Sequence, residues 1–148
     1  MDIAEYLAVI DRLCAREFPA ERGRSDLVVG GPGYFLAELE ASHGLRPGCA
    51  ERREGAADDF HALKEALSQV LDARKGRRQE PWGMLTLRVR RARGEAIPEP
   101  WSELSLRTDE LNLWGPDESG RWLAVGVADR DPADGIRLLA VVTDMGPP

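Results

Sequence analysis

The arginines between residues 74 and 93 are the residues whose type and spacing most clearly suggest chemistry. This stretch holds eight basic residues and one acid, so its formal charge is +7, whereas the rest of the chain carries −13. Arg88 and Arg90 alternate with apolar residues and share one face of a predicted strand. Arginine suits bidentate capture of carboxylates and phosphates. The stretch therefore predicts binding of an acidic protein or a small anionic ligand.

The end of this predicted strand is its most informative part. After Val89 the face that should point into the core continues as Arg91 and Arg93, so the strand is expected to run past the edge of the core. Trp82, at its beginning, would add a surface on which a flat ligand could stack. Arg88, Arg90, Arg91 and Arg93 are thus the predicted anion-binding residues.

The binding hypothesis has a structural alternative. Arg74 and Lys75 complement the end of a predicted helix, and Arg88 and Arg90 could be a solvated strand face opposite acids of neighbouring strands. Nucleic acid is disfavoured as the anion, because the negative charge of the flanking sequence would repel it.

The four tryptophans all fall in the second half of the chain. Trp114 and Trp122 flank one hairpin-type loop, so they are expected to lie near each other. If exposed, they would form an interaction hot spot. If buried, they would pack in the core or at a sheet edge, which their large apolar area favours.

Two loops contain residue types that hold ions. Residues 30–33 (Gly-Gly-Pro-Gly) lie between a short strand and a predicted helix, as in phosphate-binding turns, but the P-loop lysine and the dinucleotide fingerprint are absent. Asp129, Asp131 and Asp134 place three carboxylates in one loop, where they could hold a hard cation. Because the loop lacks EF-hand spacing and contains Pro132, no metal or other cofactor is predicted.

The histidines and cysteines provide only weak candidates for catalysis. His61 or His43 could act as a general base, and Cys14 or Cys49 as a nucleophile. Cys14 falls on the apolar face of a predicted helix, which favours an inert buried thiol. Because no nucleophile elbow, zinc motif or P-loop is present, a non-catalytic protein is predicted, with His61 as the one weak catalytic candidate.

Composition narrows the class of protein. The 148 residues suit one domain with a sizeable core, and 43% are hydrophobic and 31% charged. No run reaches the roughly 18 to 20 apolar residues of a membrane span, the N-terminus lacks the features of a secretory signal, and the cysteines form no disulfide framework. A cytoplasmic protein that does not bind membranes is expected. The preference for arginine over lysine suggests a GC-rich bacterial genome.

Helices are predicted in the first half of the chain. Apolar residues recur with a helical period over residues 2–17 and 58–75, and Asp58 or Asp59 can cap the second of these helices. Between them, residues 46–57 contain proline, glycines and a charged run, so an exposed loop is predicted there.

The segment after residue 26 allows two interpretations. A short strand over residues 27–29, a glycine turn and a helix over residues 34–43 is the preferred one. The alternative is one extended segment over residues 27–36, because tyrosine and phenylalanine suit strands.

Alternating apolar residues predict strands in the second half. These strands cover residues 82–93, 104–107, 111–114, 122–128 and 136–143. Apolar positions change parity between Leu106 and Leu111, which requires a bulge or bend near residues 108–110. The last strand is apolar on both faces, as in a strand that is central or covered on both sides.

The predicted fold is therefore α+β in a single domain, with a helical part at about residues 1–76 and a sheet part at about 82–145. Two or three N-terminal helices would pack on one face of a mostly antiparallel sheet of four to five strands. The predicted function is a binding or protein-interaction module that uses the arginine-rich strand. The alternative is a ligand-binding or catalytic cup between helices and sheet, lined by His61 and tryptophans. The oligomeric state, including a homodimer, is left open.

Overall fold

The computed structural model describes residues 2–42 and 50–148, which form four helices and seven strands. In chain order these are α1 (Ile3–Ala15), β1 (Gly23–Ser25), β2 (Val28–Gly31), β3 (Tyr34–Ala41), α2 (Ala50–Lys75), β4 (Trp82–Gly83), α3 (Leu85–Ala92), α4 (Trp101–Arg107), β5 (Thr108–Trp114), β6 (Trp122–Ala128) and β7 (Arg137–Thr143). The protein is thus α+β with an antiparallel sheet, as the sequence predicts.

The seven strands form one open sheet in the order β1-β2-β3-β7-β6-β5-β4, with every pair antiparallel. Strand β7 is the last in the chain but lies at the centre, between β3 and β6. The units β1–β3 and β4–β6 therefore meet only across β7.

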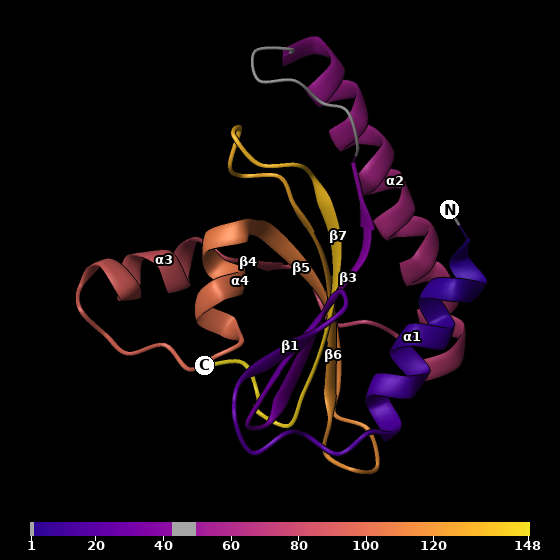
Figure 1. The fold of residues 1–148 in the computed structure, drawn as a ribbon, viewed down its shortest axis with the longest axis vertical. Helices are drawn as coiled ribbons and strands as arrows, with labels where there is room; N and C mark the ends of the chain where they lie inside the picture. Colours follow the sequence, from indigo (N-terminus) through magenta and orange to yellow (C-terminus); the bar gives the residue numbers. More distant parts are fainter. Residues whose placement is uncertain (1, 43–49) are drawn as a thin grey trace.

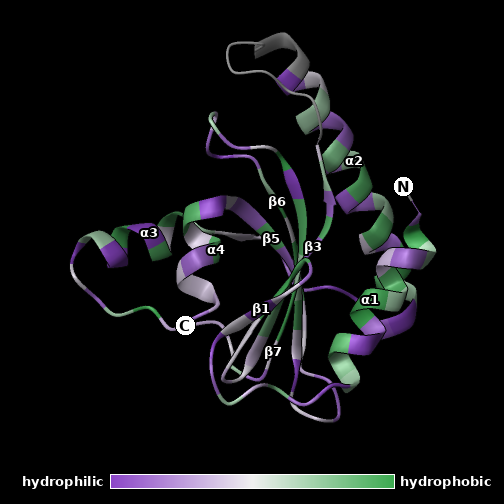
Figure 2. Ribbon diagram, viewed as in Figure 1, coloured by the Kyte–Doolittle hydropathy of each residue, from purple (hydrophilic) through white to green (hydrophobic). Residues whose placement is uncertain are grey.

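Helices cover both faces of this sheet: α1 and α2 lie on one side, and α3 and α4 on the other (Figure 1). Hydrophobic residues gather on the strands between these two layers (Figure 2). The core under α1 and α2 includes Ile10, Phe35, Leu67, Leu71 and Leu138. The core under α3 and α4 includes Leu36, Leu87, Trp101, Leu104 and Leu139.

The prediction of four to five strands with helices on one face was wrong in its details. Three strands of the sheet come from the first half of the chain, where only β2 overlaps a predicted strand (residues 27–29), and α3 and α4 supply the second helical layer. The interpretation of the last strand was right, because β7 is central and buried on both faces. Its two-sided apolar pattern already required cover on both sides of the sheet.

The helix predicted over residues 34–43 is strand β3 within the described part of that segment. A hairpin turn joins it to β2, and Gly33 in this turn has a φ of +81°. A side chain at Gly31 would meet the Tyr34 ring at 2.5 Å. Pairing with β2 on one side and β7 on the other outweighs the helical preference of the alanines and glutamates in β3. The phosphate-turn hypothesis is therefore wrong, because no helix follows the glycines.

Helix α2 begins at Ala50, earlier than predicted, so residues 50–57 are helical and not part of a loop. The glutamates and arginines of this segment are good helix formers, and their sum outweighs the roughly 1 kcal/mol that Gly55 costs. Arg53 also ties this end of the helix to the β6–β7 loop, because its guanidinium donates to the backbone carbonyls of Asp129, Asp131 and Asp134 at 3.3, 2.7 and 2.6 Å.

A ladder of three polar contacts joins α2 to β5. Lys64 Nζ donates to the Glu110 carbonyl at 3.3 Å. One turn further on, the Asn112 amide donates to Ser68 Oγ at 2.8 Å. After another turn, Trp114 Nε1 donates to Asp72 Oδ1 at 3.0 Å. The spacing of four residues on the helix matches that of two on the strand, so each rung is satisfied.

The strand predicted around Leu104 and Leu106 is helix α4, whereas the predicted irregularity after it is present. The register of β5 against β6 shifts between Thr108 and Leu111. No helix among the described residues is long and apolar enough to cross a membrane.

Candidate functional site

The basic stretch over residues 74–93 is divided among four structural segments. Its first part is engaged in ion pairs near the end of α2: Arg74 with Asp11 at 3.1 Å, and Arg78 with Glu65 and Asp72 at 2.9 and 3.0 Å. Arg74 and Arg78 are therefore paired with acids of the same chain.

The second part of the stretch is helix α3, and the prediction of a strand over residues 82–93 was wrong beyond Gly83. Strand β4 pairs only with the beginning of β5, where Gly83 lies opposite Glu110 and Met84 N donates to the Asp109 carbonyl at 2.9 Å. Because β5 begins at Thr108, a longer β4 would soon have no partner for its backbone groups. Leucine and arginine are good helix formers, so the chain continues as a helix.

Two of the α3 arginines point toward α4 and hold the helix in place. Arg88 Nη1 donates to two backbone carbonyls at the α4–β5 junction, at 3.0 and 3.1 Å, and its Nη2 lies 3.6 Å from Asp109. Arg91 Nε donates to Ser102 Oγ at 3.2 Å. Arg88 is therefore largely engaged within the chain, whereas Arg91 is exposed and engaged through its Nε.

The other two arginines lie on the outer side of α3. Arg90 Nε is 3.5 Å from Glu95 in a partly exposed pair. Arg93 is exposed at the end of the helix, and no ion pair of the described residues includes it.

Two apolar side chains of α3 are also on its outer side. Leu85 is 65% exposed and Val89 is 40% exposed, whereas Leu87 between them is 1% exposed. On a helix, residues 85, 89 and 93 follow one ridge and residue 87 falls on the opposite side. We call the set formed by Leu85, Val89, Arg90 and Arg93 the arginine-helix surface.

The tryptophans are distributed over both faces of the sheet and do not gather on this surface. Trp82 packs edge-to-face against Trp101 under α3 and α4, with ring centroids 5.2 Å apart. Trp114 is 3% exposed and faces α2. Trp122 packs on the side of α3 and α4. Trp114 and Trp122 nevertheless border one pocket of about 410 Å³ at the end of the β5–β6 hairpin.

His61 is not among the residues that line this pocket. It is half exposed on α2, and its Nε2 lies 2.9 Å from Asp129 Oδ2. The cup hypothesis required His61 and tryptophans to line a common pocket, so this pocket does not match it.

The three aspartates of the β6–β7 loop have separate partners. Asp129 faces His61, Asp131 accepts from a backbone N–H of its own turn, and Asp134 accepts from Arg137 at 2.9 Å. Burial acts to raise the pKa of Asp134, but hydrogen bonds, led by that from Arg137, outweigh it and lower the pKa. Among the described residues, no three potential ligand side chains are grouped for a metal ion.

Cys14 lies at the edge of the Trp114–Trp122 pocket. Burial raises the pKa of its thiol despite the Lys75 ammonium 3.8 Å from Sγ, so the thiol stays protonated and is a poor nucleophile. The other two candidates, His43 and Cys49, lie outside the described residues.

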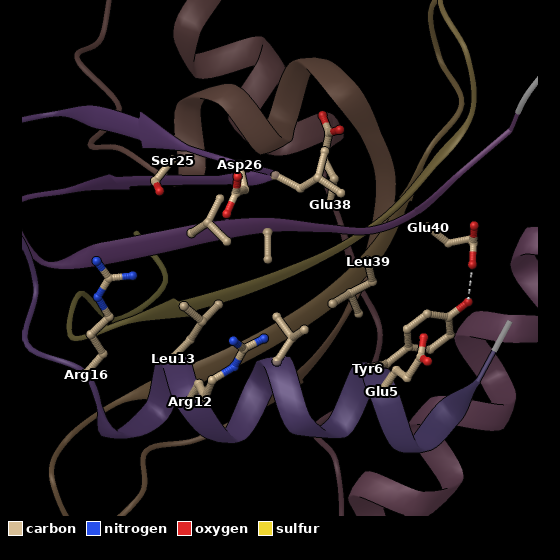
Figure 3. A pocket seen from close by; sticks show the side chains of 14 residues that line it. Glu5, Tyr6, Arg12, Leu13, Arg16, Ser25, Asp26, Glu38, Leu39 and Glu40 are labelled. Atoms are coloured by element: carbon tan, nitrogen blue, oxygen red, sulfur yellow. Dashed lines mark hydrogen bonds between the residues drawn. The ribbon is translucent and has the colours of Figure 1, made fainter.

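A groove that the sequence analysis missed lies between α1 and the strands β1–β3 (Figure 3). Its volume is about 380 Å³. The apolar part of its lining includes Leu13, Val28, Ala37 and Leu39. Arg12 and Arg16 project toward it from the α1 side, one helical turn apart, and Arg16 also lies 5.5 Å from the centre of the Phe35 ring.

At the other end of the groove, the Tyr6 hydroxyl donates to Glu40 Oε2 at 2.7 Å. A bulge in β3 makes this contact possible. The register against β7 shifts between Glu38 and Glu40, so Glu38 faces α4 whereas Glu40 faces α1. Burial, followed by the hydrogen bond to Glu40, raises the pKa of Tyr6, so its hydroxyl keeps its proton.

Part of this groove was visible in the sequence. Arg12 and Arg16 are four residues apart beside the apolar stripe of α1, which places them at the edge of its buried face. Glu40 could not be placed, because its position depends on a bulge in a segment that was predicted to be helical.

The comparisons with known proteins add no family to this description. No family model, curated protein or solved structure matches the chain.

Proposed function

We propose that the protein is a non-catalytic binding module whose arginine-helix surface docks an acidic amphipathic helix of a partner protein. The observation that carries the proposal is the exposure of Leu85 and Val89, one turn apart and in line with Arg93. Helix recognition commonly uses apolar anchors at this spacing with charged residues around them.

The apolar pair is out of place on a helix that serves only to cover the sheet. Such a helix would have polar residues on its outer face, and conflicts between local pattern and fold are typical of functional sites. Fully burying a leucine or valine side chain is worth about 1.5–3 kcal/mol. Leu85 is 65% and Val89 40% exposed, so a partner helix that covers them gains the corresponding part of this free energy.

The charge of α3 defines the partner. Residues 81–94 contain four arginines and no acid, in a chain whose formal net charge is −6. A partner with glutamates around its apolar stripe would be attracted to this surface and repelled by most of the remainder. Such complementarity mainly raises the association rate and the specificity.

The test uses a synthetic helical peptide with leucines at i and i+4 and glutamates elsewhere, measured by fluorescence anisotropy. The double variant Leu85→Ser/Val89→Ser should weaken binding at least about tenfold, the equivalent of about 1.4 kcal/mol. Arg93→Ala should weaken binding less and make it less sensitive to salt. Arg77→Ala, an exposed arginine outside α3, is the matched control and should leave the affinity unchanged.

Three results would count against the proposal. The first is equal affinity of the double variant and the native chain. The second is a dimer in sedimentation equilibrium that depends on Leu85 and Val89, because a second copy would then occupy the surface. The third is retention of an oligonucleotide at low salt that Arg93→Ala abolishes. The bacterial origin and the cytoplasmic setting stay predictions from composition.

A further inference from the structure

The α1–β3 groove has opposite charges at its two ends. Arg12 and Arg16 lie toward one end, and Glu5 and Glu40 toward the other (Figure 3). Within residues 2–42 and 50–148, neither of these guanidinium groups has an ion-pair partner. The positive end therefore has donors available for a ligand.

Other carboxylates line the groove, and they make a ligand with only negative charge unsuitable for it. Glu38 is neutralised by Arg107 and Arg137 at 3.4 and 3.3 Å. Asp26, however, also lines the strand side of the groove, and Glu5 and Glu40 lie at its negative end. A purely anionic ligand would be repelled by them, whereas a ligand with both charges would match the lining.

The length of the groove sets the distance between those charges. With a rise of 1.5 Å per residue, Arg12 and Arg16 lie about 9 and 15 Å along α1 from Tyr6. An extended chain of three or four residues spans about 10–14 Å. The charges of a single amino acid are much closer together than this, so one amino acid cannot reach both ends.

We propose that the groove binds a tri- or tetrapeptide with free termini, with its C-terminal carboxylate on Arg12 and Arg16 and its N-terminal ammonium at Glu40. The apolar lining, including Leu13, Val28 and Leu39, takes the peptide side chains. The volume of about 380 Å³ is within the roughly 300–1,000 Å³ of small-molecule sites.

The two ends of the groove differ in burial and in hydrogen bonding. Glu40 is held by the hydroxyl of Tyr6, which is itself 3% exposed and fixed in the core. The arginines are exposed and one turn apart, so they can both reach one carboxylate, which arginine binds in a bidentate manner. Because the arginines bind the C-terminal carboxylate and Glu40 binds the N-terminal ammonium, both termini of the peptide must be free.

The test compares Leu-Ala-Leu with its N-acetylated and C-amidated forms, by isothermal titration calorimetry and by amide chemical shifts of α1 and β3. The free peptide is expected to bind with a Kd of about 0.1–1 mM, an affinity that a small number of contacts can provide. Blocking either terminus should weaken it at least about tenfold. Arg12→Gln/Arg16→Gln should abolish the difference between free and amidated peptide, and Glu40→Gln the difference between free and acetylated peptide.

Arg77→Gln is the matched control and should change none of these affinities. Tyr6→Phe removes only the hydroxyl and should weaken the free peptide more than the acetylated one. Equal binding of the free and blocked peptides, or shifts confined to residues outside the groove, would overturn the proposal. Leu85→Ser/Val89→Ser should leave Leu-Ala-Leu binding unchanged, so this test is independent of the one for α3.

Discussion

The two helical layers hold the sheet by different interactions. The layer of α1 and α2 combines an apolar core with the polar ladder from Lys64 to Asp72 and with the ion pairs of Arg78. The layer of α3 and α4 has two short helices whose packing centres on Trp101 and Leu104, both fully buried. Arg88 and Arg91 add hydrogen bonds at its inner edge.

The two layers also differ in the surface that they leave exposed. In α1, the core residues lie on one face with helical spacing, and the charged residues beside them border a groove. In α3, a pattern with a period of two is wound into a helix, so one leucine is buried and its two apolar neighbours are exposed. The layer of α1 and α2 borders a groove, and the layer of α3 and α4 exposes two apolar side chains on its outer face; we propose each of these as a binding surface.

The largest expected effect compares the two cores directly. Leu67→Ala in α2 and Leu87→Ala in α3 should each lower the free energy of unfolding by about 2–5 kcal/mol, because both side chains are essentially inaccessible and leave a cavity. Urea unfolding followed by tryptophan fluorescence measures both. A cost below about 1 kcal/mol for Leu87→Ala alone would mean that α3 adds little to the stability of the sheet.

The polar ladder should respond differently to single and double changes. Ser68→Ala leaves the buried Asn112 amide without its acceptor and should cost about 1–3 kcal/mol. In the double variant Ser68→Ala/Asn112→Leu no polar group is left unpaired, so stability should recover in part. If the double variant is as unstable as the sum of the two single variants, the rung makes no specific contribution.

The ion pairs of Arg78 predict a pH-dependent stability. Burial raises the pKa of Asp72, but hydrogen bonds from Arg78 and Trp114 outweigh it, so the folded pKa is below the unfolded value of about 3.9. The pKa of Glu65 is lowered mainly by its hydrogen bond from Arg78. The unfolded state then binds protons first, so this stabilisation is present above about pH 4 and is lost as the pH falls through the folded pKa.

Arg78→Ala should accordingly cost about 1–3 kcal/mol at neutral pH and less near pH 2–3, because the carboxylates take up protons as the pH falls below about 4. The urea midpoint at the two pH values measures this change. Arg77→Ala, next to it in sequence and exposed, should have little effect at either pH. An equal cost of Arg78→Ala at both pH values would contradict the role given to the carboxylates.

The smallest expected effect concerns the outer face of α3. Leu85→Ser and Val89→Ser should change the free energy of unfolding by no more than about 0.5 kcal/mol, because both side chains are exposed. Thermal unfolding of the two variants measures this. A loss comparable to that of Leu87→Ala would show that the pair supports the fold, and would remove the basis for a docking surface.

Much of the sheet was predictable, because strands β5 and β6 alternate, β7 is a continuous apolar run, and the turns before β6 and β7 contain proline and glycine. Helix α1 and the second half of α2 were predictable from their helical period. The two-sided apolar pattern of β7 also contained the information that both faces are covered. We interpreted this pattern as a property of one strand and did not infer from it that helices cover both faces of the sheet.

The remaining elements depend on tertiary contacts. The period of two in α3 favours a strand. Because β5 begins at Thr108, a strand there would have no partner, and the leucines and arginines form a helix instead. In β3 the alanines and glutamates favour a helix, and pairing with β2 and β7 overrides them. The arginines that were predicted to bind an anion lie on helix α3 and not on a strand, and their binding role stays a prediction. The groove depends on the bulge before Glu40 and could not be derived from residue spacing.

The central position of β7 has a consequence for synthesis on the ribosome. Strands β1–β3 emerge early and β4–β6 later, but these two groups share no backbone pairing, because β7 lies between them. The sheet can close only after β7 has been made, and until then each group exposes a long unpaired edge. Chains that stop before Arg137 should therefore aggregate, so the last strand determines whether a nascent chain becomes a folded molecule.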